Sequence, residues 1–291
     1  TVTGNTAVKA GDYLLTITGK GNFTGTATAK WSIEKEADNV EISKENFPDN
    51  SFRSYVKNNF DKNNNGYLEK AEIIAVNKIS VNSRNISDLK GVEYFKELTY
   101  LDCSDNKLES LDISKNTELT ALYCYYNKLE SLDVSKNTKL IRLYCDSNKL
   151  ESLDVSNNAE LLELFCENNQ LESLGVNNNS KLTHLYCYSN KLESLELSND
   201  TGLLYLFCDN NNIKNLDISN NTALTYLNCN NNNLTRLDIS NNTELIYLYC
   251  NTNKLTSLDV SNNSRLIDPE CRSNTYDIGL TGDKYDLSEL P

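Results

Sequence analysis

The chain has 291 residues, a formal net charge of −13 and a single histidine. Its basic residues form no patch, which argues against a nucleic-acid-binding protein, and no apolar run approaches the ~20 residues of a membrane-spanning helix. Methionine and an export signal are absent, so we expect the sequence to be a processed part of a longer protein.

Residues 1–35 predict a β-hairpin. Two threonine-rich runs, in which apolar and polar residues alternate, flank the turn sequence GKGN. The segment AGDYLLTITGKGNFTGTATAKWSIEK resembles the last strands of a bacterial immunoglobulin-like repeat. A complete sandwich of that kind takes about 100 residues, so we expect this segment to end an upstream domain.

Residues 45–75 predict a small helical cap around a calcium-binding loop. Residues 61–72 read DKNNNGYLEKAE and match the D-x-[DN]-x-[DN]-G-x5-E pattern of an EF-hand. Before the loop, Phe52, Val56 and Phe60 follow helical spacing. The pattern assigns Ca²⁺ ligands to Asp61, Asn63, Asn65, the backbone carbonyl of Tyr67, Glu69 and the bidentate Glu72. The alternative is a helix–turn–helix cap that keeps this shape without metal.

A repeat of 21 residues dominates the rest of the chain. Cysteines recur at 103, 124, 145, 166, 187, 208, 229, 250 and 271, and an asparagine stands three residues after each. The pattern LxxLxCxxNxLxxLDVSxNxx suits short strands separated by tight bends, because its apolar spacing is not that of a helix. Residues 76–97 form a degenerate first unit, with Ile79, Val81, Ile86 and Leu89 at the apolar positions.

This pattern identifies a leucine-rich repeat and resembles the short bacterial class in which LxxLDLxx echoes the first half of the unit. The resemblance implies a mainly β repeat solenoid over residues 76–274, with two short parallel strands per 21-residue turn. A cap or linker then follows at 275–291. FPDNSFRSYVKNNFDKNNNGYLEKAE resembles the N-terminal cap of surface proteins from gut Gram-positive bacteria, which implies a secreted or cell-surface location. GVEYF resembles the internalins, but repeat length and cysteines differ, so their partners do not carry over.

Stacked units place equivalent residues in ladders about 4.8 Å apart. We expect the cysteines to be buried free thiols, because their parallel Cβ vectors disfavour bridges. The asparagines at 106–274 should satisfy backbone groups at one bend. A second ladder at the other bend comprises Asn116, Asn137, Asn158, Asn179, Asp200, Asn221, Asn242 and Asn263. An acidic ladder comprises Asp112, Asp133, Asp154, Glu196, Asp217, Asp238 and Asp259, and calcium bridging along it stays open.

Aromatic residues provide the predicted binding surface. Between the second leucine and the cysteine of each unit stand Tyr123, Tyr144, Phe165, Tyr186, Phe207 and Tyr249, and Tyr205, Tyr226 and Tyr247 lie two residues before that position. Strand alternation points these rings away from the core, and an exposed aromatic stripe often marks an interface. The competing interpretation is that the rings only stabilise the sheet.

These features predict a binding or adhesion module of a bacterial cell-surface protein, with a host or microbial protein or glycan as its ligand. The alternative is a structural stalk that displays other domains. His184 lacks a nucleophile at fixed spacing, so we do not expect an enzyme.

Overall fold

The computed structural model describes residues 2–3, 11–20, 24–33, 39–199, 201–274 and 279–281. Within these ranges, no helix is long and apolar enough to cross a membrane. Asp200 of the second bend ladder and most of the C-terminal segment 275–291 lie outside them.

The N-terminal segment forms a three-stranded antiparallel sheet. Its strands are β1 (Val2–Thr3), β2 (Gly11–Thr18) and β3 (Thr26–Ile33). Strands β2 and β3 pair along their full length, from Gly11 opposite Ile33 to Thr18 opposite Thr26. The predicted hairpin is therefore confirmed, whereas its immunoglobulin-like origin stays a prediction.

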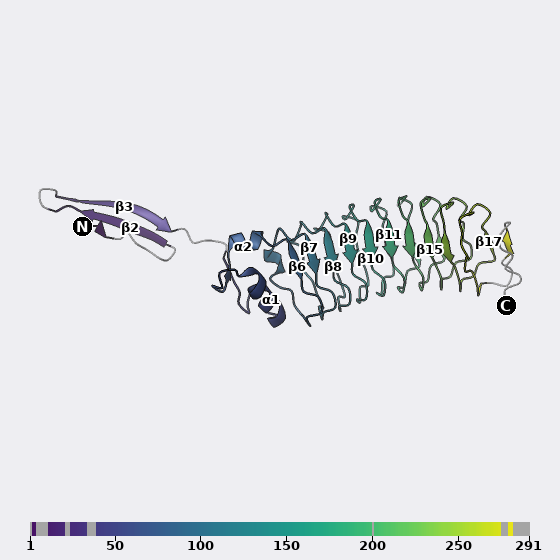
Figure 1. The fold of residues 1–291 in the computed structure, drawn as a ribbon, viewed down its shortest axis with the longest axis horizontal. Coiled ribbons are helices and arrows are strands. Elements are labelled where there is room, and N and C mark those ends of the chain that lie inside the picture. Colours follow the sequence, from purple (N-terminus) through teal and green to yellow (C-terminus); the bar gives the residue numbers. More distant parts are fainter. Residues whose placement is uncertain are drawn as a thin grey trace.

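A small helical cap precedes the solenoid (Figure 1). It contains β4 (Val40–Glu41), α1 (Asn50–Phe60), β5 (Tyr67–Leu68) and α2 (Lys70–Ile74), and β4 pairs with β5. Asp49 starts α1 by accepting hydrogen bonds from the N–H groups of Ser51 and Phe52, at 2.8 and 3.0 Å. Its second oxygen accepts from Ser87 N–H at 3.0 Å, so the same carboxylate ties α1 to the first coil.

Aromatic packing holds the cap on the end of the repeat core. Phe60 of α1 contacts Phe95 with ring centroids 5.3 Å apart, and Phe47 contacts Phe52 at 5.9 Å. Gly91 allows the Phe47 ring to pack directly against the backbone at residue 91. A Cβ at this position would stand 2.2 Å from Phe47, and its φ of 104° also favours glycine. The 3₁₀ helix η1 (Val92–Tyr94) follows directly.

The described part of the solenoid is built on one nine-stranded parallel sheet in chain order (Figure 1). Each strand has three residues and pairs in register with its equivalent in the next coil. The strands are β6 (Lys78–Ser80), β7 (Tyr100–Asp102), β8 (Ala121–Tyr123), β9 (Arg142–Tyr144), β10 (Glu163–Phe165), β11 (His184–Tyr186), β13 (Tyr205–Phe207), β15 (Tyr226–Asn228) and β16 (Tyr247–Tyr249).

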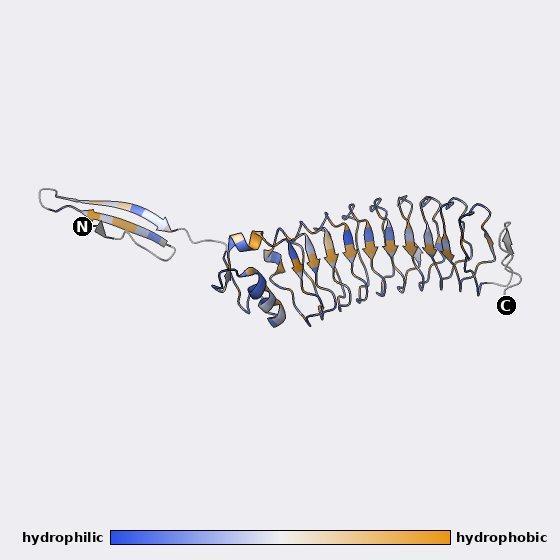
Figure 2. Cartoon of the chain, viewed as in Figure 1, coloured by the Kyte–Doolittle hydropathy of each residue, from blue (hydrophilic) through white to orange (hydrophobic). Residues whose placement is uncertain are grey.

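The core follows the repeat pattern. The central leucine of each strand from Leu101 to Leu248 is buried, as are the cysteines. The degenerate first unit contributes Ile79, Val81, Ile86 and Leu89 to the same core, so its assignment is confirmed. Apolar residues concentrate in the strands, whereas the bends are mostly hydrophilic (Figure 2).

The prediction of two strands in every coil was wrong for most coils. On the side of the coil opposite the nine-stranded sheet, the described residues form two strand pairs and one isolated bridge. The first pair is β12 (Ser194–Leu195) with β14 (Asn215–Leu216), and the second is β17 (Ser257–Asp259) with β18 (Gly279–Thr281). The bridge joins Gly175 to Glu196. In most other coils an aspartate accepts a hydrogen bond from the serine N–H two residues later, as in Asp133 to Ser135 at 2.9 Å. The same turn also occurs in the coils that carry β14 and β17, at Asp217 and Asp259, so it accompanies both arrangements.

These turns also explain how the acidic ladder tolerates its like charges. The hydrogen bonds from Ser135 lower the pKa of Asp133, and the same arrangement lowers the pKa of Asp112, Asp154, Asp217, Asp238 and Asp259. Each carboxylate is therefore stabilised in its ionised form by its own turn. Calcium bridging along this face has no support, because no group of three or more His, Cys, Asp or Glu among the described residues is disposed to hold a metal.

The predicted role of the first asparagine ladder is confirmed, and the described asparagines of the second ladder form similar hydrogen bonds. The Asn148 amide donates to the carbonyls of Cys124, Cys145 and Asp146 at 3.0–3.1 Å, and its oxygen accepts from Leu129 N–H at 2.9 Å. At the other bend, the buried Asn137 donates to the carbonyls of Ile113 and Asn116. Each of these side chains joins two successive coils.

The expectation of nine free thiols needs one correction. Seven cysteines, from Cys103 to Cys229, are free and buried, and burial raises their pKa values. Cys250 and Cys271 instead form a disulfide, with Cα atoms 4.7 Å apart, a separation within the normal range for such bonds. This pair lies where the repeat pattern ends, so Cys271 is less confined by a following coil.

Candidate functional site

The outer face of the nine-stranded sheet carries the predicted ligand-binding residues. We call one set the aromatic row: Tyr123, Tyr144, Phe165, Tyr186, Phe207 and Tyr249, each the last residue of its strand. A second set, the flanking row, holds His184, Tyr205, Tyr226 and Tyr247, each the first residue of its strand. Both rows point away from the buried leucines, as strand alternation requires.

The aromatic row is a stack of rings rather than a set of separate side chains. Phe165 lies parallel to Tyr144 and to Tyr186, with 4.2 Å between centroids on both sides and interplanar angles of 6° and 2°. Tyr123 meets Tyr144 edge to face at 4.9 Å, and Phe207 is tilted against Tyr186 at 4.4 Å. The one-strand spacing of about 4.8 Å brings equivalent rings to stacking distance.

Tyr226 closes the gap that Asn228 leaves in the aromatic row. Its ring leans across from the flanking row and stacks on Phe207 at 4.6 Å and on Tyr249 at 5.5 Å. Burial and a hydrogen bond with Tyr249 raise the pKa of Tyr226 to about 12. Ring contacts are therefore continuous from β8 to β16, over a distance of roughly 30 Å at the usual strand spacing.

This stacking modifies the expectation of an exposed stripe. The rings of the aromatic row are half-buried, because each covers the faces of its neighbours, and Tyr247 of the flanking row is the most open at 41% exposed. Ring edges and hydroxyl groups therefore face the solvent in the centre of the row. The sequence predicted these positions and their outward direction, but it did not predict that neighbouring rings cover one another.

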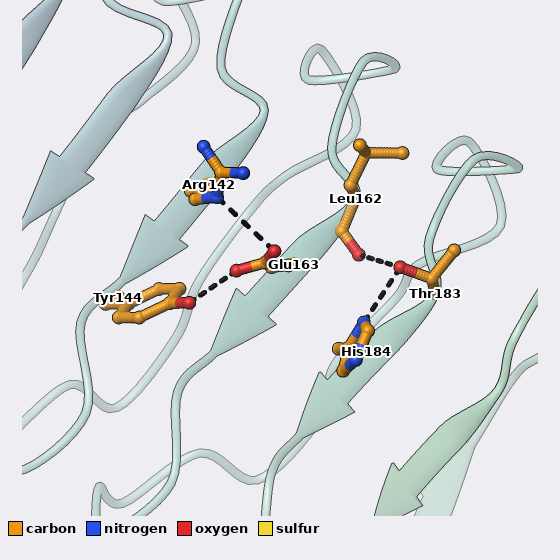
Figure 3. A network of polar contacts seen from close by, with 6 residues as sticks. All are labelled: Arg142, Tyr144, Leu162, Glu163, Thr183 and His184. Carbon is orange, nitrogen blue, oxygen red and sulfur yellow. Dashed lines mark hydrogen bonds and ion pairs between the residues drawn. The ribbon is translucent and has the colours of Figure 1, made fainter.

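Polar contacts fix the centre of the face (Figure 3). Glu163 accepts hydrogen bonds from the Tyr144 hydroxyl and, at 3.3 Å, from Arg142 Nε. Burial and the Glu163 contact both raise the pKa of Tyr144. One strand further on, Thr183 donates to the carbonyl of Leu162 at 3.0 Å, and its oxygen lies 2.9 Å from His184 Nδ1.

His184 therefore belongs to the sheet surface. Its ring stacks on Tyr205, with centroids 4.7 Å apart, and Thr183 is its hydrogen-bond partner. These contacts orient the imidazole on the sheet surface.

A set of acidic side chains beside the rings was missed by sequence analysis. We call it the carboxylate row: Asp146, Glu167 and Asp209, each one residue after a ladder cysteine. Glu167 is only 7% exposed, and its Oε2 atom has no hydrogen-bond partner. Burial, with a smaller contribution from the Asp146 charge, raises the pKa of Glu167 to about 7. Reading the residue after each cysteine as a column would have found this row.

The loop predicted to bind calcium lies between α1 and α2. Asp61 is buried, and its oxygens accept hydrogen bonds from the N–H groups of Asn65 and Gly66 at 3.1 and 3.0 Å. Glu72 accepts from the N–H groups of Lys62 and Glu69. Asn63 and Asn65 both donate to Glu69 Oε1 at 2.9 Å, so the predicted ligand side chains gather on one loop. Tyr67, the remaining predicted ligand, lies in β5.

Comparison with solved structures defines the class of protein. The functional domain of InlJ from Listeria monocytogenes, which includes a cysteine ladder, is 30% identical with a TM-score of 0.53. The alignment covers 82% of this chain and 62% of that chain. The chain is thus an internalin-like leucine-rich-repeat domain that spans less than two thirds of that relative. No protein-family model and no curated protein matches the sequence.

Two further structures agree on the fold alone. The leucine-rich-repeat protein LIC12759 from Leptospira interrogans is 24% identical with a TM-score of 0.65, covering 72% of this chain and 58% of that one. The internalin InlF from Listeria monocytogenes is 21% identical with a TM-score of 0.51, covering 81% and 85%.

Proposed function

We propose that this domain is a surface-displayed binding module that recognises a protein through the aromatic and flanking rows. The observation that carries the proposal is the continuous ring surface from β8 to β16, which lies on one flat sheet face. Interfaces concentrate their free energy in a few aromatic anchors, and tyrosine is one of the residues they favour. A rigid row of tyrosines loses little conformational entropy on binding, which also favours an interface.

Ring geometry favours a protein over a glycan. Sugars typically stack their C–H groups on an open aromatic face, but both faces of Phe165 are covered by Tyr144 and Tyr186. Ring edges carry partial positive charge and tyrosine hydroxyls form hydrogen bonds, so this surface suits peptide carbonyls and side chains.

The same stacking supports the alternative of a structural stalk. Ring pairs across neighbouring strands stabilise a sheet by about 0.2–1 kcal/mol each, so the row could serve the solenoid alone. A substitution that removes rings must therefore be judged by both binding and stability.

A triple substitution separates these two functions. We expect Tyr144→Ser, Phe165→Ser and Tyr186→Ser together to weaken binding to protein arrays at least ~30-fold, because truncating even one anchor costs ~2 kcal/mol or more. The array of extracellular proteins is probed with the full chain alongside a glycan array, and circular dichroism monitors the fold. Tyr126→Ser is the matched control, because Tyr126 is 60% exposed at a bend outside both rows.

The outcomes are distinct. Unchanged binding by the triple variant, or failure of the native chain to bind any arrayed protein, overturns the proposal and favours the stalk. Binding to glycans alone shows that the ligand class is wrong.

We also propose that the loop of residues 61–72 binds one calcium ion and stiffens the cap. Its donors would be Asp61, Asn63, Asn65, Tyr67 and Glu72, with Glu69 acting through water. Two observations support this assignment, because both hold the loop folded on itself. Asp61 is buried, and β4 pairs with β5. The side-chain oxygens of Asn63 and Asn65 and the backbone carbonyl of Tyr67 are essential ligands in this proposal, since no cluster of three acidic side chains in the described part suits a metal.

Calorimetry tests the calcium site. We expect one site with a dissociation constant of about 10⁻⁶–10⁻³ M, because Asn63 and Asn65 contribute no charge. Glu72→Gln should abolish binding and Asn63→Asp should strengthen it, while Glu130→Gln, at an exposed position of the solenoid, should change nothing. Absence of heat at millimolar calcium, or an unchanged affinity in Asn63→Asp, contradicts the proposal.

A further inference from the structure

We propose that the carboxylate row is the recognition site for a positively charged side chain of the protein partner, above all an arginine. This inference rests on the proposed function and names the chemistry that the partner must present. The row, formed by Asp146, Glu167 and Asp209, lies on the same sheet face as the aromatic row.

Elsewhere on the solenoid, carboxylates are paired with basic side chains of the same chain. Acidic side chains on the surface pair with a basic residue 21 positions away, on the neighbouring coil. These pairs are Glu118–Lys139, Arg142–Glu163, Glu160–Lys181, Glu193–Lys214 and Glu244–Arg265. Four of these five carboxylates are at least 38% exposed, so the chain mostly supplies cations to carboxylates that water already solvates.

The carboxylate row lacks such a partner although it is more buried. No lysine, arginine or histidine of the described residues forms an ion pair with Asp146, Glu167 or Asp209. Their polar contacts are neutral. The Ser147 hydroxyl donates to Asp146 at 3.1 Å and the Asn210 amide donates to Asp209 at 2.5 Å. Glu167 keeps one buried oxygen without any partner. Buried carboxylates are stable only when compensated, so the row is complementary to a cation from outside.

The surroundings favour a guanidinium group. Tyr188 occupies the same column between Glu167 and Asp209, and Tyr186 of the aromatic row lies on the same strand segment. Phe165 pairs with Tyr186 across neighbouring strands and Asn168 N–H donates to the Tyr188 carbonyl at 3.1 Å, so Glu167 and Tyr188 occupy equivalent positions on neighbouring coils. Arginine pairs with carboxylates through two parallel hydrogen bonds and stacks on aromatic rings, whereas lysine offers a point charge.

A ligand can reach the carboxylate row through its half-buried members. Asp146 is partly exposed and sits one strand from Glu167, at a spacing of about 4.8 Å. A cation that contacts Asp146 therefore lies close enough to attract the Glu167 carboxylate. We expect the partner's arginine to act as the charged anchor beside the aromatic contacts.

A peptide pair tests this inference on the full chain. The probe is a short capped peptide that contains Tyr-Arg-Gly-Arg, and its matched control replaces each arginine with citrulline, which has similar shape but no charge. We expect only the arginine peptide to bind in NMR titrations. Asp146→Asn with Glu167→Gln should weaken its affinity at least tenfold. Asp133→Asn with Asp154→Asn removes the same charge from exposed positions of the opposite face and should retain affinity.

Each result decides the inference. Absence of arginine-peptide binding at millimolar concentration, equal binding of the citrulline peptide, or equal loss in both double variants overturns it. Equal loss would mean that net charge alone attracts the peptide. If the arginine peptide binds as expected but the aromatic triple variant retains its array partners, the proposed function fails while this inference stands.

Discussion

The burial of Glu167 could not be predicted from the sequence. It occupies an outward position of the repeat, where a glutamate would ordinarily be solvated. Its burial comes instead from neighbours on adjacent strands, and their charges and rings determine its pKa. A sequence records the column of residues after each cysteine, but not how deeply each of them is buried.

Glu167→Gln should stabilise the protein in a pH-dependent way. The folded-state pKa of about 7 lies above the ordinary 4.5, so the protonated form is favoured by folding. Stability is therefore full below about pH 4.5 and is lost as the pH rises through 7. Chemical denaturation should give the variant a gain of about 1–3 kcal/mol at pH 8 and little at pH 4.5.

The control for this prediction is Glu172→Gln at an exposed position. Groups that act on Glu167 include Asp146 and Tyr188, and Asp209 acts on Tyr188 in turn, so their titration is part of the measured curve. An equal gain at both pH values would show that the carboxylate is not the cause.

At the scale of the element, the strand and its bend differ in how well the repeat predicts them. The inward leucines and cysteines follow from alternation, and so does the outward direction of the aromatic row. The prediction of a second strand fails because the repeat pattern on that side does not determine strand pairing, and the Asp–x–Ser turn occurs in coils with a strand there and in coils without one. The residue two positions after each cysteine, such as Tyr126 at φ 51°, adopts a left-handed conformation that its residue type does not announce.

Asn148→Ala should test how much the bend contributes. This substitution removes the bonds to Cys124, Cys145 and Asp146 and leaves Leu129 N–H without its acceptor. We expect a loss of about 1–3 kcal/mol in the free energy of unfolding, since buried backbone groups lose their partners. Urea denaturation measures it, with Asn157→Ala at an exposed position as control. Equal losses in both variants would contradict a special role for the ladder.

At the scale of the whole molecule, the repeat makes the fold predictable because each coil contacts mainly its neighbours. The 21-residue interval was enough to place the core and the degenerate first coil, whereas the loop motif and the helical spacing before it placed the helical cap. The disulfide was not predictable from the repeat, since Cys250 and Cys271 occupy the same repeat position as the free cysteines before them. Only the end of the array distinguishes them.

Thiol titration tests that distinction. In denaturant without reductant, we expect seven reactive thiols, because Cys250 and Cys271 are joined. After reduction the count should rise to nine, the total in the sequence. Peptide mapping should recover the Cys250–Cys271 link. Nine thiols before reduction of protein purified under oxidising conditions would contradict the bridge.

The parallel sheet has a mechanical consequence when the two ends of the solenoid are pulled apart. Its backbone hydrogen bonds run from coil to coil, along the length of the solenoid. Tension applied between the two ends loads these bonds one coil at a time, as in unzipping, instead of all at once. Each released coil lengthens the tether by roughly 70 Å, the reach of 21 extended residues. The Cys250–Cys271 bond closes a loop of one repeat, so the last coil would resist this extension until the bond is reduced.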